Sequence, residues 1–558
     1  MGAIFRLYNV DWDQGYHLHP DERAIVSTAD DIAMPKTVTE FFSSTSPLNP
    51  HFFAYGSLPF YLVKLVGQNL SGINPDFAHY ALLNIPGRFI SAISDLITIF
   101  LIFLLGRKLF GKNAGLLAAF FYAASVLPIQ LSHFYAVDTL LTMWITATLY
   151  LLIVFYEHPT TKHAFLIGLY FGFALATKIS ALVLVVGIGT SLAADFFFLV
   201  AKQPHKPKHW LPHVPAFLKH LIIYGGIIAL TTCIIFALLE PYALIDFQDF
   251  WTQTEQQSAM TKDAFTFPYT LQFVGKIPYV YELKNLFLYG LGPLLGLLAI
   301  LGIGYVTYTS LIKERQNKWA QEIILLTFFF TYFAIVGHFA IGFMRYMMPL
   351  YPLLTIFAAV LSLRIFAAFA VEGKLKYILY AYFIIATLVW PVSFLHIYSQ
   401  SNTRVTATEW IHHNIPSGNT IAIEHWDDRL PLSGENYYNL EELPLYDPDT
   451  AVKWQGIRET LGRADYLIIA SNRLYVPLQK LTDCANLPLG RCYPETALYY
   501  RKLFSNQLGF QKVAEFSSYP TLPFFNIPLN DQGADENFTV FDHPKIMIFK
   551  KTAPLPQF

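Results

Sequence analysis

Apolar stretches long enough to cross a lipid bilayer recur along the first 400 residues of this chain, and they constrain its fold more than any other feature. A membrane-crossing helix needs about 20 consecutive, mostly apolar residues. Such stretches occur at about ten places: 86–106, 114–132, 138–156, 163–178, 179–200, 220–240, 285–310, 321–342, 346–369 and 377–398. Charged residues make up only 14% of the 558 residues, whereas they make up about a quarter of a typical soluble domain. The sequence therefore predicts a mainly α-helical polytopic membrane protein.

Basic residues fall in every second loop between these stretches. They are Arg107, Lys108, Lys112, Lys162, Lys202, Lys206, Lys208, Lys219, Lys313, Arg315, Lys318, Lys374 and Lys376. Because cytoplasmic loops are enriched in Lys and Arg, the other loops are expected on the extracytoplasmic side. These include the N-terminal segment, the turn at 132–138, the turns near Lys178 and Arg345, the long loop 241–284, and the C-terminal part of the chain.

Changes in composition divide the chain into three regions. Residues 1–80 are expected to form an extracytoplasmic loop with short interfacial helices, because Pro, Asn and Ser clusters interrupt their apolar runs. Residues 81–400 form the expected transmembrane core, with 241–284 as its external loop. Residues 401–558 contain an amphipathic helix and the strand-like runs ADYLIIAS and KIMIFKK, which predict an extracytoplasmic α/β domain.

Two further features of composition bear on location and partners. Cys484 and Cys492 lie close together in the predicted external domain, where their spacing allows a disulfide. The net charge of −1 gives no indication of a nucleic-acid partner. The expected surroundings are membrane lipids.

Acidic residues placed next to the membrane are the candidates for chemistry. Asp21 and Glu22 are neighbours in HLHPDER, and Asp138 stands at the mouth of an apolar stretch in HFYAVDTLL. Carboxylates are costly to bring near hydrocarbon, so each needs a reason to be there. If the two loops meet, their acids form a site with a general base. The alternatives are a solvated loop for the pair and a helix N-cap for Asp138.

The DE pair in the first external loop, the acid in the second, and the segment RYMMPLYP near the end of the spans together resemble the type-C glycosyltransferases. The resemblance covers roughly residues 1–400 and is to prokaryotic members of the protein O-mannosyltransferase-like group, with the aminoarabinose lipid A transferases as relatives. It implies an inverting enzyme that moves a sugar from a polyprenyl- or dolichyl-phosphate carrier at the outer membrane face. The sugar is expected to be a hexose such as mannose, and the acceptor a sugar, a lipid or a protein.

One departure from the family pattern concerns the start of the chain. The family has a transmembrane helix before the first external loop, and here only about ten residues precede DWDQG. The chain is therefore expected either to begin late or to lack that helix.

The resemblance assigns roles to individual residues. Asp21 matches the first acid of the family's DE motif and is expected to be the general base, while Glu22 would hold the acceptor or orient Asp21. Asp138 matches the acid at the start of the family's fourth helix and would bind the acceptor, or a divalent ion shared with Asp21. Lys178 and Arg345 match basic positions and would contact the donor phosphate. The alternative for both cations is a membrane-edge anchor.

Other polar residues are weaker candidates. Alternate residues of an extended segment point to one side, so His17, His19 and Asp21 are candidate ligands of a divalent metal ion, with a polar edge of the site as the alternative. No other cofactor is expected. Tyr269 and Gln272 would contact the acceptor or the sugar, although their residue types also suit any interfacial loop.

Two residues are given mainly structural interpretations. His133 is a candidate for the acceptor or sugar site, although packing or hydrogen bonding suits it better. Arg88 is expected to pair with Asp95, two turns further along the same helix, because unpaired charges are costly in lipid.

Two other functional classes remain as alternatives. A flippase or transporter of lipid-linked sugars would place charged residues at mid-membrane depth and would contain repeat-related, interrupted spans. A non-catalytic membrane scaffold would leave the DE pair without a function. The gathering of acids at one face, with no evident internal repeat, favours the transferase.

Overall fold

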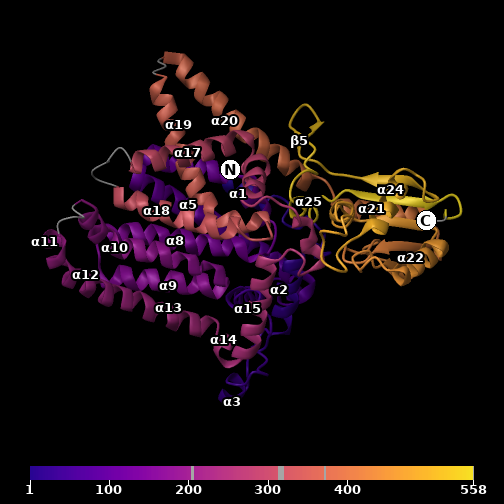
Figure 1. Cartoon of the computed structure of the whole chain (residues 1–558), viewed down its shortest axis with the longest axis horizontal. Helices are drawn as coiled ribbons and strands as arrows, with labels where there is room; N and C mark the ends of the chain where they lie inside the picture. The colour runs from indigo at the N-terminus through magenta and orange to yellow at the C-terminus, as the bar shows by residue number, and fades with distance from the viewer. Residues whose placement is uncertain (203–206, 312–318, 370–372, 557–558) are drawn as a thin grey trace.

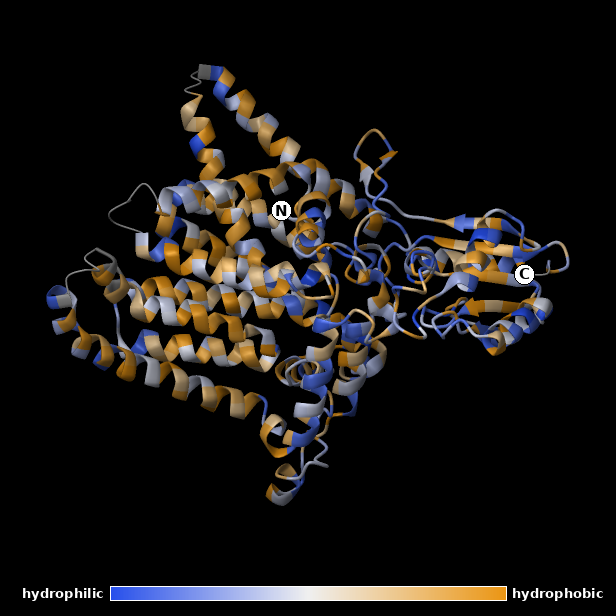
Figure 2. Cartoon of the chain, viewed as in Figure 1, coloured by the Kyte–Doolittle hydropathy of each residue, from blue (hydrophilic) through white to orange (hydrophobic). Residues whose placement is uncertain are grey.

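The computed structural model describes residues 1–202, 207–311, 319–369 and 373–556. Long helices pack side by side, and a sheet-containing C-terminal domain lies at one end of them (Figure 1). Apolar residues dominate the helical part (Figure 2). Among the described residues, seven helices are long and apolar enough to cross a membrane, or eight if a bent pair forms one span. The protein is therefore a mainly α-helical, multi-pass membrane protein.

Each of the ten predicted apolar stretches contains helix. The elements of this part are α5 (Tyr80–Phe110), α6 (Lys112–Ala123), α7 (Val126–Ser132), α8 (Val137–Glu157), α9 (Thr161–Thr177), η2 (Ile179–Val183), α10 (Leu184–Lys202), α11 (Pro207–Trp210), η3 (Leu211–His213), α12 (Val214–His220), η4 (Leu221–Gly225), α13 (Gly226–Leu239), η6 (Leu286–Gly290), α17 (Pro293–Leu311), α18 (Trp319–Gly337), η7 (Met344–Leu350), α19 (Tyr351–Ala368), α20 (Gly373–Leu395) and η8 (His396–Ser399). The stretch at 163–178 forms α9, which has 17 residues and is shorter than the spans.

The predicted stretch 114–132 is not one straight helix. It forms α6 and α7, which are bent by 58° relative to each other. The break falls at Ala124 and Ser125, and Ser125 has an extended backbone. Pro128 explains the position of the break, because proline has no N–H to donate to the carbonyl four residues earlier and its ring clashes with that carbonyl.

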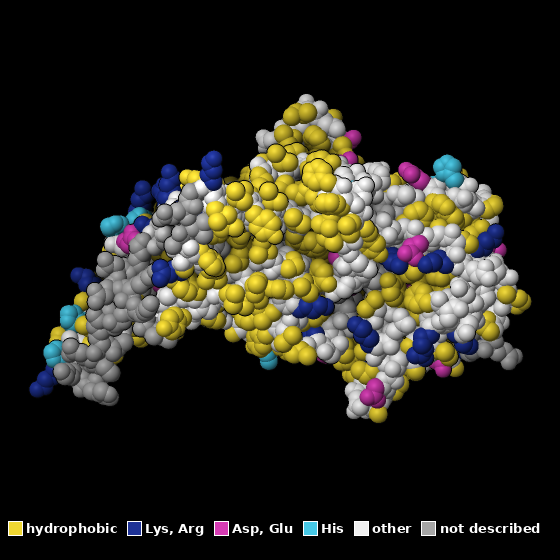
Figure 3. Space-filling view, turned by 90° about the horizontal axis from the view of Figure 1, so that it is seen from above, with side chains coloured by type: hydrophobic (Ala, Val, Ile, Leu, Met, Phe, Trp, Pro, Cys, Tyr) yellow, Lys and Arg dark blue, Asp and Glu magenta, His cyan; other side chains and the backbone are white. Residues whose placement is uncertain are grey.

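The basic loops lie at one end of the helical bundle. Lys108 at the end of α5 forms an ion pair with Glu157 at the end of α8, and Gln321 near the start of α18 donates a hydrogen bond of 2.7 Å to Glu157. A broad apolar belt covers the middle of the molecule. Lys and Arg side chains lie on both sides of this belt, at the end away from the C-terminal domain and around that domain (Figure 3). Among the predicted basic positions, Lys206, Lys313, Arg315 and Lys318 lie outside the described residues.

Two segments cover the other end of the bundle. Residues 1–80 form short helices, namely α1 (Gly2–Leu7), α2 (Pro20–Asp31), α3 (Val38–Phe41), α4 (Leu58–Leu70) and η1 (Pro75–Ala78). The loop 241–284 contributes α14 (Tyr242–Ile245), α15 (Phe247–Lys262), η5 (Pro268–Phe273) and α16 (Val280–Asn285). Figure 1 shows that both segments lie at the end of the bundle to which the C-terminal domain is attached.

The C-terminal domain is built on a five-stranded sheet with the order β2-β1-β3-β7-β4. Strands β1 (Thr420–Glu424), β2 (Asn439–Leu443) and β3 (Tyr466–Ile469) are parallel, whereas β7 (Ile546–Lys551) and β4 (Phe510–Phe516) join as antiparallel strands. The remaining elements are α21 (Thr403–Asn414), η9 (Glu435–Tyr437), α22 (Ala451–Arg463), α23 (Tyr475–Leu478), α24 (Pro494–Phe504), β5 (Thr521–Leu522), β6 (Ile527–Pro528) and α25 (Glu536–Thr539).

Apolar side chains cover both faces of this sheet. Leu467 and Phe549 pack with Trp454 of α22 on one face, and Ile468 and Ile548 pack with α21 on the other. These alternating positions in ADYLIIAS and KIMIFKK are the period-two pattern of strands buried on both faces. The prediction of a C-terminal α/β domain is confirmed.

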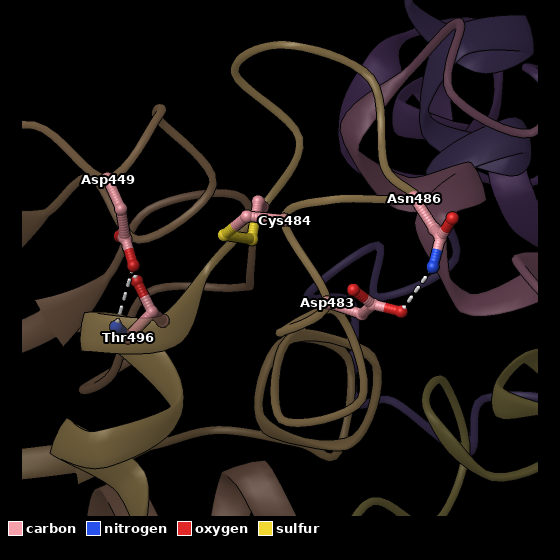
Figure 4. Close-up of a disulfide and its surroundings, with 6 residues drawn as sticks. Asp449, Asp483, Cys484, Asn486 and Thr496 are labelled. Atoms are coloured by element: carbon pink, nitrogen blue, oxygen red, sulfur yellow. Dashed lines mark hydrogen bonds between the residues drawn. A yellow bond between two sulfur atoms is a disulfide. The ribbon is translucent and has the colours of Figure 1, made fainter.

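Cys484 and Cys492 form a disulfide in this domain. It closes a short loop that follows α23 and precedes α24 (Figure 4). Asp449 accepts a hydrogen bond of 3.0 Å from the backbone N–H of Thr496 nearby. Because disulfides persist in oxidising compartments, this bond is typical of a domain outside the cytoplasm.

Candidate functional site

Helix α2 positions the first acid of the DE pair. His19 is its N-cap residue, and its ring Nδ1 accepts a hydrogen bond from the backbone N–H of Glu22. Pro20 begins the helix and Asp21 lies in the first turn, where the helix dipole favours a carboxylate. Asp21 forms an ion pair with Arg345. The loop at 17–22 and the turn at Arg345, far apart in sequence, therefore meet at one place.

Glu22 points away from Asp21 into the protein. Its two carboxylate oxygens accept hydrogen bonds of 2.6 and 2.9 Å from Arg88, and one of them accepts another of 2.8 Å from the backbone N–H of Tyr135. Arg88 also binds Asp13, and all three charged side chains are fully buried. Glu22 thus connects the first loop to α5 and to the turn before α8. It does not line the cavity that lies beside Asp21.

The predicted pairing of Arg88 with Asp95 is wrong. Asp95 instead binds Arg6 of α1 and accepts a hydrogen bond of 2.6 Å from the hydroxyl of Tyr122. The error has a physical cause, since spacing along one helix suggests only partners on that helix. The first loop supplies Asp13 and Glu22 to Arg88, and α1 supplies Arg6 to Asp95.

A cavity of about 340 Å³ lies beside Asp21. Five residues singled out from the sequence line it together: Asp21, Lys178, Tyr269, Gln272 and Arg345. Its wall also contains Pro20, Phe52, Ala54, Tyr55, Gln257, Met260, Phe343, Tyr346, Trp426, Arg473, Glu536, Asn537 and Phe541. The cavity therefore combines two acids, three cations and several aromatic rings.

A second, more apolar cavity of about 420 Å³ adjoins the first. The two share the wall residues Ala54, Lys178, Gln257, Met260 and Tyr346. Phe53, Leu141, Ile179, Val336 and Phe339 are among the apolar residues of the second cavity. The two cavities thus form one polar and one apolar compartment that meet at Lys178.

Lys178 and Asp138 are paired at this junction. The Lys178 Nζ lies 3.3 Å from a carboxylate oxygen of Asp138 and 4.6 Å from the ring centre of Tyr346. Lys178 caps the C-terminus of α9, where the helix dipole favours a cation. Asp138 lines the apolar cavity and is almost fully buried; it lies in the first turn of α8, whose N-cap is Ala136. The N-cap alternative for Asp138 is therefore wrong.

The three candidate metal ligands do not converge. His17 stacks on Tyr80 and His19 stacks on Phe134, each with ring centres 4.4 Å apart. Burial, reinforced by the charge of Arg345, lowers the pKa of His19 well below its usual value. Within the part of the chain that the structure describes, the one group of His and acidic residues close enough to share a metal ion is His51, Asp246 and Asp249.

His133 lies outside the walls of both cavities. Its ring nitrogens lie 2.8 Å from the carbonyl oxygen of Ile129 and 2.9 Å from that of Tyr8, and the ring stacks on Tyr398 at 3.9 Å. His133 is therefore in a packing and hydrogen-bonding environment, which is the alternative to its interpretation as an acceptor- or sugar-binding residue.

The C-terminal domain completes the cavity wall with residues that the sequence reasoning did not single out. Trp426 and Arg473 follow β1 and β3, which are adjacent parallel strands, so their carboxyl ends reach the same edge of the sheet. Arg473 forms an ion pair of 2.7 Å with Glu536, which accepts a hydrogen bond of 2.6 Å from Gln272. Burial raises the pKa of Glu536. The charged residues that follow β1 in EHWDDR and β3 in ASNR were the signal for this edge.

A second contact ties the C-terminal domain to the helix of the DE pair. Arg23 of α2 forms an ion pair of 2.7 Å with Asp428, two residues after Trp426. Arg404 lies between Asp427 and Asp428, and the charges of Arg404 and Arg23 lower the pKa of Asp428 despite its burial. The position of Trp426 is thus coupled to the position of Asp21.

Comparisons with known proteins concern both sequence and fold. The family described as dolichyl-phosphate-mannose-protein mannosyltransferase matches residues 83–241. No curated protein matches the chain at a significant level.

Three solved structures illustrate the likeness in fold. The Archaeoglobus fulgidus oligosaccharyltransferase complex with Zn and sulfate is 12% identical, with 99% of this chain and 88% of that chain covered and a TM-score of 0.48. ArnT from Cupriavidus metallidurans bound to undecaprenyl phosphate is 14% identical, with 100% and 98% covered and a TM-score of 0.43. The S. cerevisiae protein O-mannosyltransferase Pmt1–Pmt2 complex bound to the sugar donor is 16% identical, with 45% and 34% covered and a TM-score of 0.31.

Proposed function

We propose that this chain is a polytopic type-C glycosyltransferase, and that it transfers a hexose such as mannose from a polyprenyl- or dolichyl-phosphate carrier to an acceptor hydroxyl, with inversion at the anomeric carbon. The family match over residues 83–241 supports this proposal. The observation that carries the proposal is the junction of the polar cavity, which contains Asp21, with the apolar cavity, at Lys178.

The two cavities match the two parts of such a donor. An isoprenoid chain is apolar and suits the walls formed by Leu141, Val336 and Phe339. Its phosphate would then lie at the junction, where Lys178 is within reach, and Arg345 lines the polar cavity beyond it. Fixed cations there stabilise the negative charge that the leaving phosphate gains in the transition state.

Asp21 is placed to act as the general base. The acceptor oxygen attacks the anomeric carbon from the side opposite the phosphate, and its proton passes to the Asp21 carboxylate. The bond between the anomeric carbon and the phosphate oxygen breaks, and its electron pair leaves with the phosphate. Arg345 forms an ion pair with Asp21 before the donor binds. The acceptor is a sugar, a lipid or a protein.

The distribution of charge supports an extracytoplasmic active site. The basic loops lie at the end of the bundle opposite the C-terminal domain, and such loops are typically cytoplasmic. Asp21, Lys178 and Arg345 lie at the other end, beside the domain that contains the Cys484–Cys492 disulfide. We therefore place the cavity and the C-terminal domain outside the cytoplasm.

Product analysis on membranes that contain the protein tests this function. The membranes are supplied with a panel of polyprenyl-phosphate sugars, and the products are identified by mass spectrometry. Asp21→Asn keeps the shape of the side chain but removes the base, so we expect transfer to fall by about 10²–10⁴-fold. The matched control is Asp31→Asn, an exposed acid on the same helix, which is expected to leave transfer unchanged.

Three outcomes would count against parts of the proposal. Transfer by Asp21→Asn at the rate of the unmodified protein would exclude Asp21 as the base. Movement of intact lipid-linked sugar between leaflets, without a new glycoside, would indicate a flippase. Loss of transfer after treatment with a chelator, restored by a divalent ion, would show that a metal takes part; we expect no loss, because Arg345 and Lys178 already balance Asp21 and Asp138.

A further inference from the structure

A small hairpin projects from the C-terminal domain next to the membrane-spanning helices. Strand β5 pairs with β6 in an antiparallel register, Thr521 opposite Pro528 and Leu522 opposite Ile527. The side chains at its tip are exposed, 99% for Phe524 and 73% for Phe525. A two-stranded hairpin is at best marginally stable in water, and neighbouring exposed aromatic residues indicate a surface that binds something apolar.

The position of the hairpin shows what that surface faces. Strand β5 contacts α20, and the hairpin lies beside the end of α20 that leads into the C-terminal domain (Figure 1). The side chains of Ile378, Tyr382 and Ile385 along α20 are more than 60% exposed, as expected for a helix that faces lipid. The exposed aromatic tip is therefore continuous with a lipid-facing helix.

A crevice connects the base of the hairpin to the spans. It has a volume of about 460 Å³ and lies between η6, the start of α17 and α20. Leu295, Trp390 and Leu529 are among its wall residues, and Leu529 directly follows β6. Its mostly apolar walls suit a lipid acyl chain. Leu529 thus brings the base of the hairpin into the wall of this crevice beside α17 and α20.

The composition of the hairpin limits what it recognises. Residues 519–530, YPTLPFFNIPLN, contain no Lys, Arg, Asp or Glu. Attraction to anionic lipid headgroups requires clustered cations, so this segment has no basis for selecting a headgroup. Aromatic side chains, in contrast, favour the boundary between headgroups and acyl chains.

We propose that the β5–β6 hairpin is a membrane-docking element of the C-terminal domain. Phe524 and Phe525 insert into the interfacial layer of the leaflet on the side of this domain, and an acyl chain of the same leaflet occupies the crevice at the base of the hairpin. The docking holds the domain against the bilayer surface beside the cavity that it helps to form.

Fluorescence quenching in vesicles tests the proposal without reference to transferase activity. Phe524→Cys is made in a Cys233→Ser background, since Cys484 and Cys492 form the disulfide and Cys233 is an exposed free thiol. The new thiol is labelled with an environment-sensitive dye, and the protein is reconstituted into phosphatidylcholine vesicles. The matched control is Val452→Cys, at a position that is 81% exposed. Val452 belongs to α22, a helix that lies far from the bundle in Figure 1.

The expected result is a blue-shifted emission at position 524 that spin-labelled phosphatidylcholine quenches and aqueous iodide does not. At position 452 we expect emission without a blue shift, which aqueous iodide quenches and spin-labelled phosphatidylcholine does not. Adding phosphatidylglycerol should leave both results unchanged. Quenching of the 524 label by iodide, as at 452, would overturn the proposal. So would protection from iodide without quenching by the lipid, because protein would then cover the tip. Asn526→Cys, at the same tip, provides a second labelled variant if Phe524→Cys gives little protein.

Discussion

Arg88 shows how a single buried charge organises the region behind the cavity. Its guanidinium group is fully buried and donates hydrogen bonds to both Asp13 and Glu22. A buried cation between two carboxylates satisfies all three charges, and removal of one partner leaves the others uncompensated. Glu22 in turn holds the turn before Asp138 through the backbone of Tyr135. Arg88 is therefore a structural residue with consequences for the site.

Arg88→Gln is expected to destabilise the protein by about 3–5 kcal/mol, because Asp13 and Glu22 would remain buried without a cation. The measurement is the midpoint of thermal unfolding in detergent, compared with that of the unmodified protein. Arg463→Gln is the control, since this cation forms an exposed ion pair with Glu441 and should leave the midpoint unchanged. Equal midpoints for all three proteins would contradict the role of Arg88.

Asp535 gives a prediction for pH. It caps α25, accepts a hydrogen bond of 2.7 Å from the hydroxyl of Tyr281, and is buried. Burial, together with the charge of Glu536, raises the pKa of Asp535 from 3.8 to about 7. Between these two values the folded protein holds a proton that the unfolded chain has released. The stability contributed by this group is therefore complete below pH 3.8 and is lost as the pH rises to about 7.

Asp535→Asn is expected to remove this contribution to the pH dependence, because asparagine does not titrate. Its carbonyl oxygen can accept the hydrogen bond from the backbone N–H of Asn537, and its amide group can donate one to the hydroxyl oxygen of Tyr281. The measurement is the unfolding midpoint of both proteins between pH 4 and pH 8. In the unmodified protein, ionisation of Asp535 should lower the free energy of unfolding by up to about 1.4 kcal/mol for each unit by which the pH rises between its unfolded and folded pKa values. Parallel curves for the two proteins would show that Asp535 has an ordinary pKa.

At the scale of elements, the disulfide is the clearest local constraint. It links Cys484 and Cys492, and Asn486 inside the closed loop donates a hydrogen bond of 2.7 Å to Asp483, which directly precedes the loop (Figure 4). Replacing both cysteines by serine should lower stability by about 2–3 kcal/mol, the value expected from the entropy of closing a loop of about nine residues. Calorimetry of oxidised, reduced and double-serine protein measures this. Identical unfolding of the oxidised and double-serine proteins would refute it.

Elements could be predicted from the sequence where their signals are local. The ten apolar stretches and the strands β3 and β7 follow from composition and periodicity within short windows. The bend between α6 and α7 was missed, although Pro128 marks it. Strands β2 and β4 were also missed, because charged residues such as Glu441, Glu442 and Lys512 interrupt their apolar runs. Both are edge strands whose side chains are mostly exposed or half-buried, so they carry little apolar signal of their own.

The site shows a different limit of sequence reasoning. The sequence singled out Asp21, Lys178 and Arg345, because acids and lone cations at membrane edges stand out against apolar surroundings. It could not supply the pairings, since Arg6 with Asp95 and Arg88 with Glu22 join residues 89 and 66 positions apart. The contribution of the C-terminal domain was hidden for the same reason. Only the folded chain brings Trp426, Arg473 and Glu536 to the cavity.

At the scale of the whole molecule, the cavity is an assembly of the first loop, the loop 241–284 and the C-terminal domain. Glu536 joins the last two, because it pairs with Arg473 and accepts a hydrogen bond from Gln272. Arg23 and Asp428 join the domain to α2. A change in the C-terminal domain should therefore alter the polar cavity while leaving the apolar cavity intact, since the residues identified in the wall of the apolar cavity all precede residue 347.

Arg473→Gln tests whether the polar cavity can change while the apolar cavity stays intact. The substitution removes the cation that Glu536 faces across 2.7 Å, so Glu536 should take up a proton or move and the polar wall should shift. We expect transfer to fall by tenfold or more, the effect of losing about 1.5–3 kcal/mol from a charge-assisted contact. Binding of the lipid-linked donor should stay unchanged, because we propose that its chain occupies the apolar cavity, whose wall does not include Arg473. The measurements are transfer rate and donor affinity for the same detergent-purified protein, with Arg463→Gln as the control from the exposed surface of the same domain. Weakened donor binding with an unchanged rate at saturating donor would show that the C-terminal domain acts on the carrier site instead.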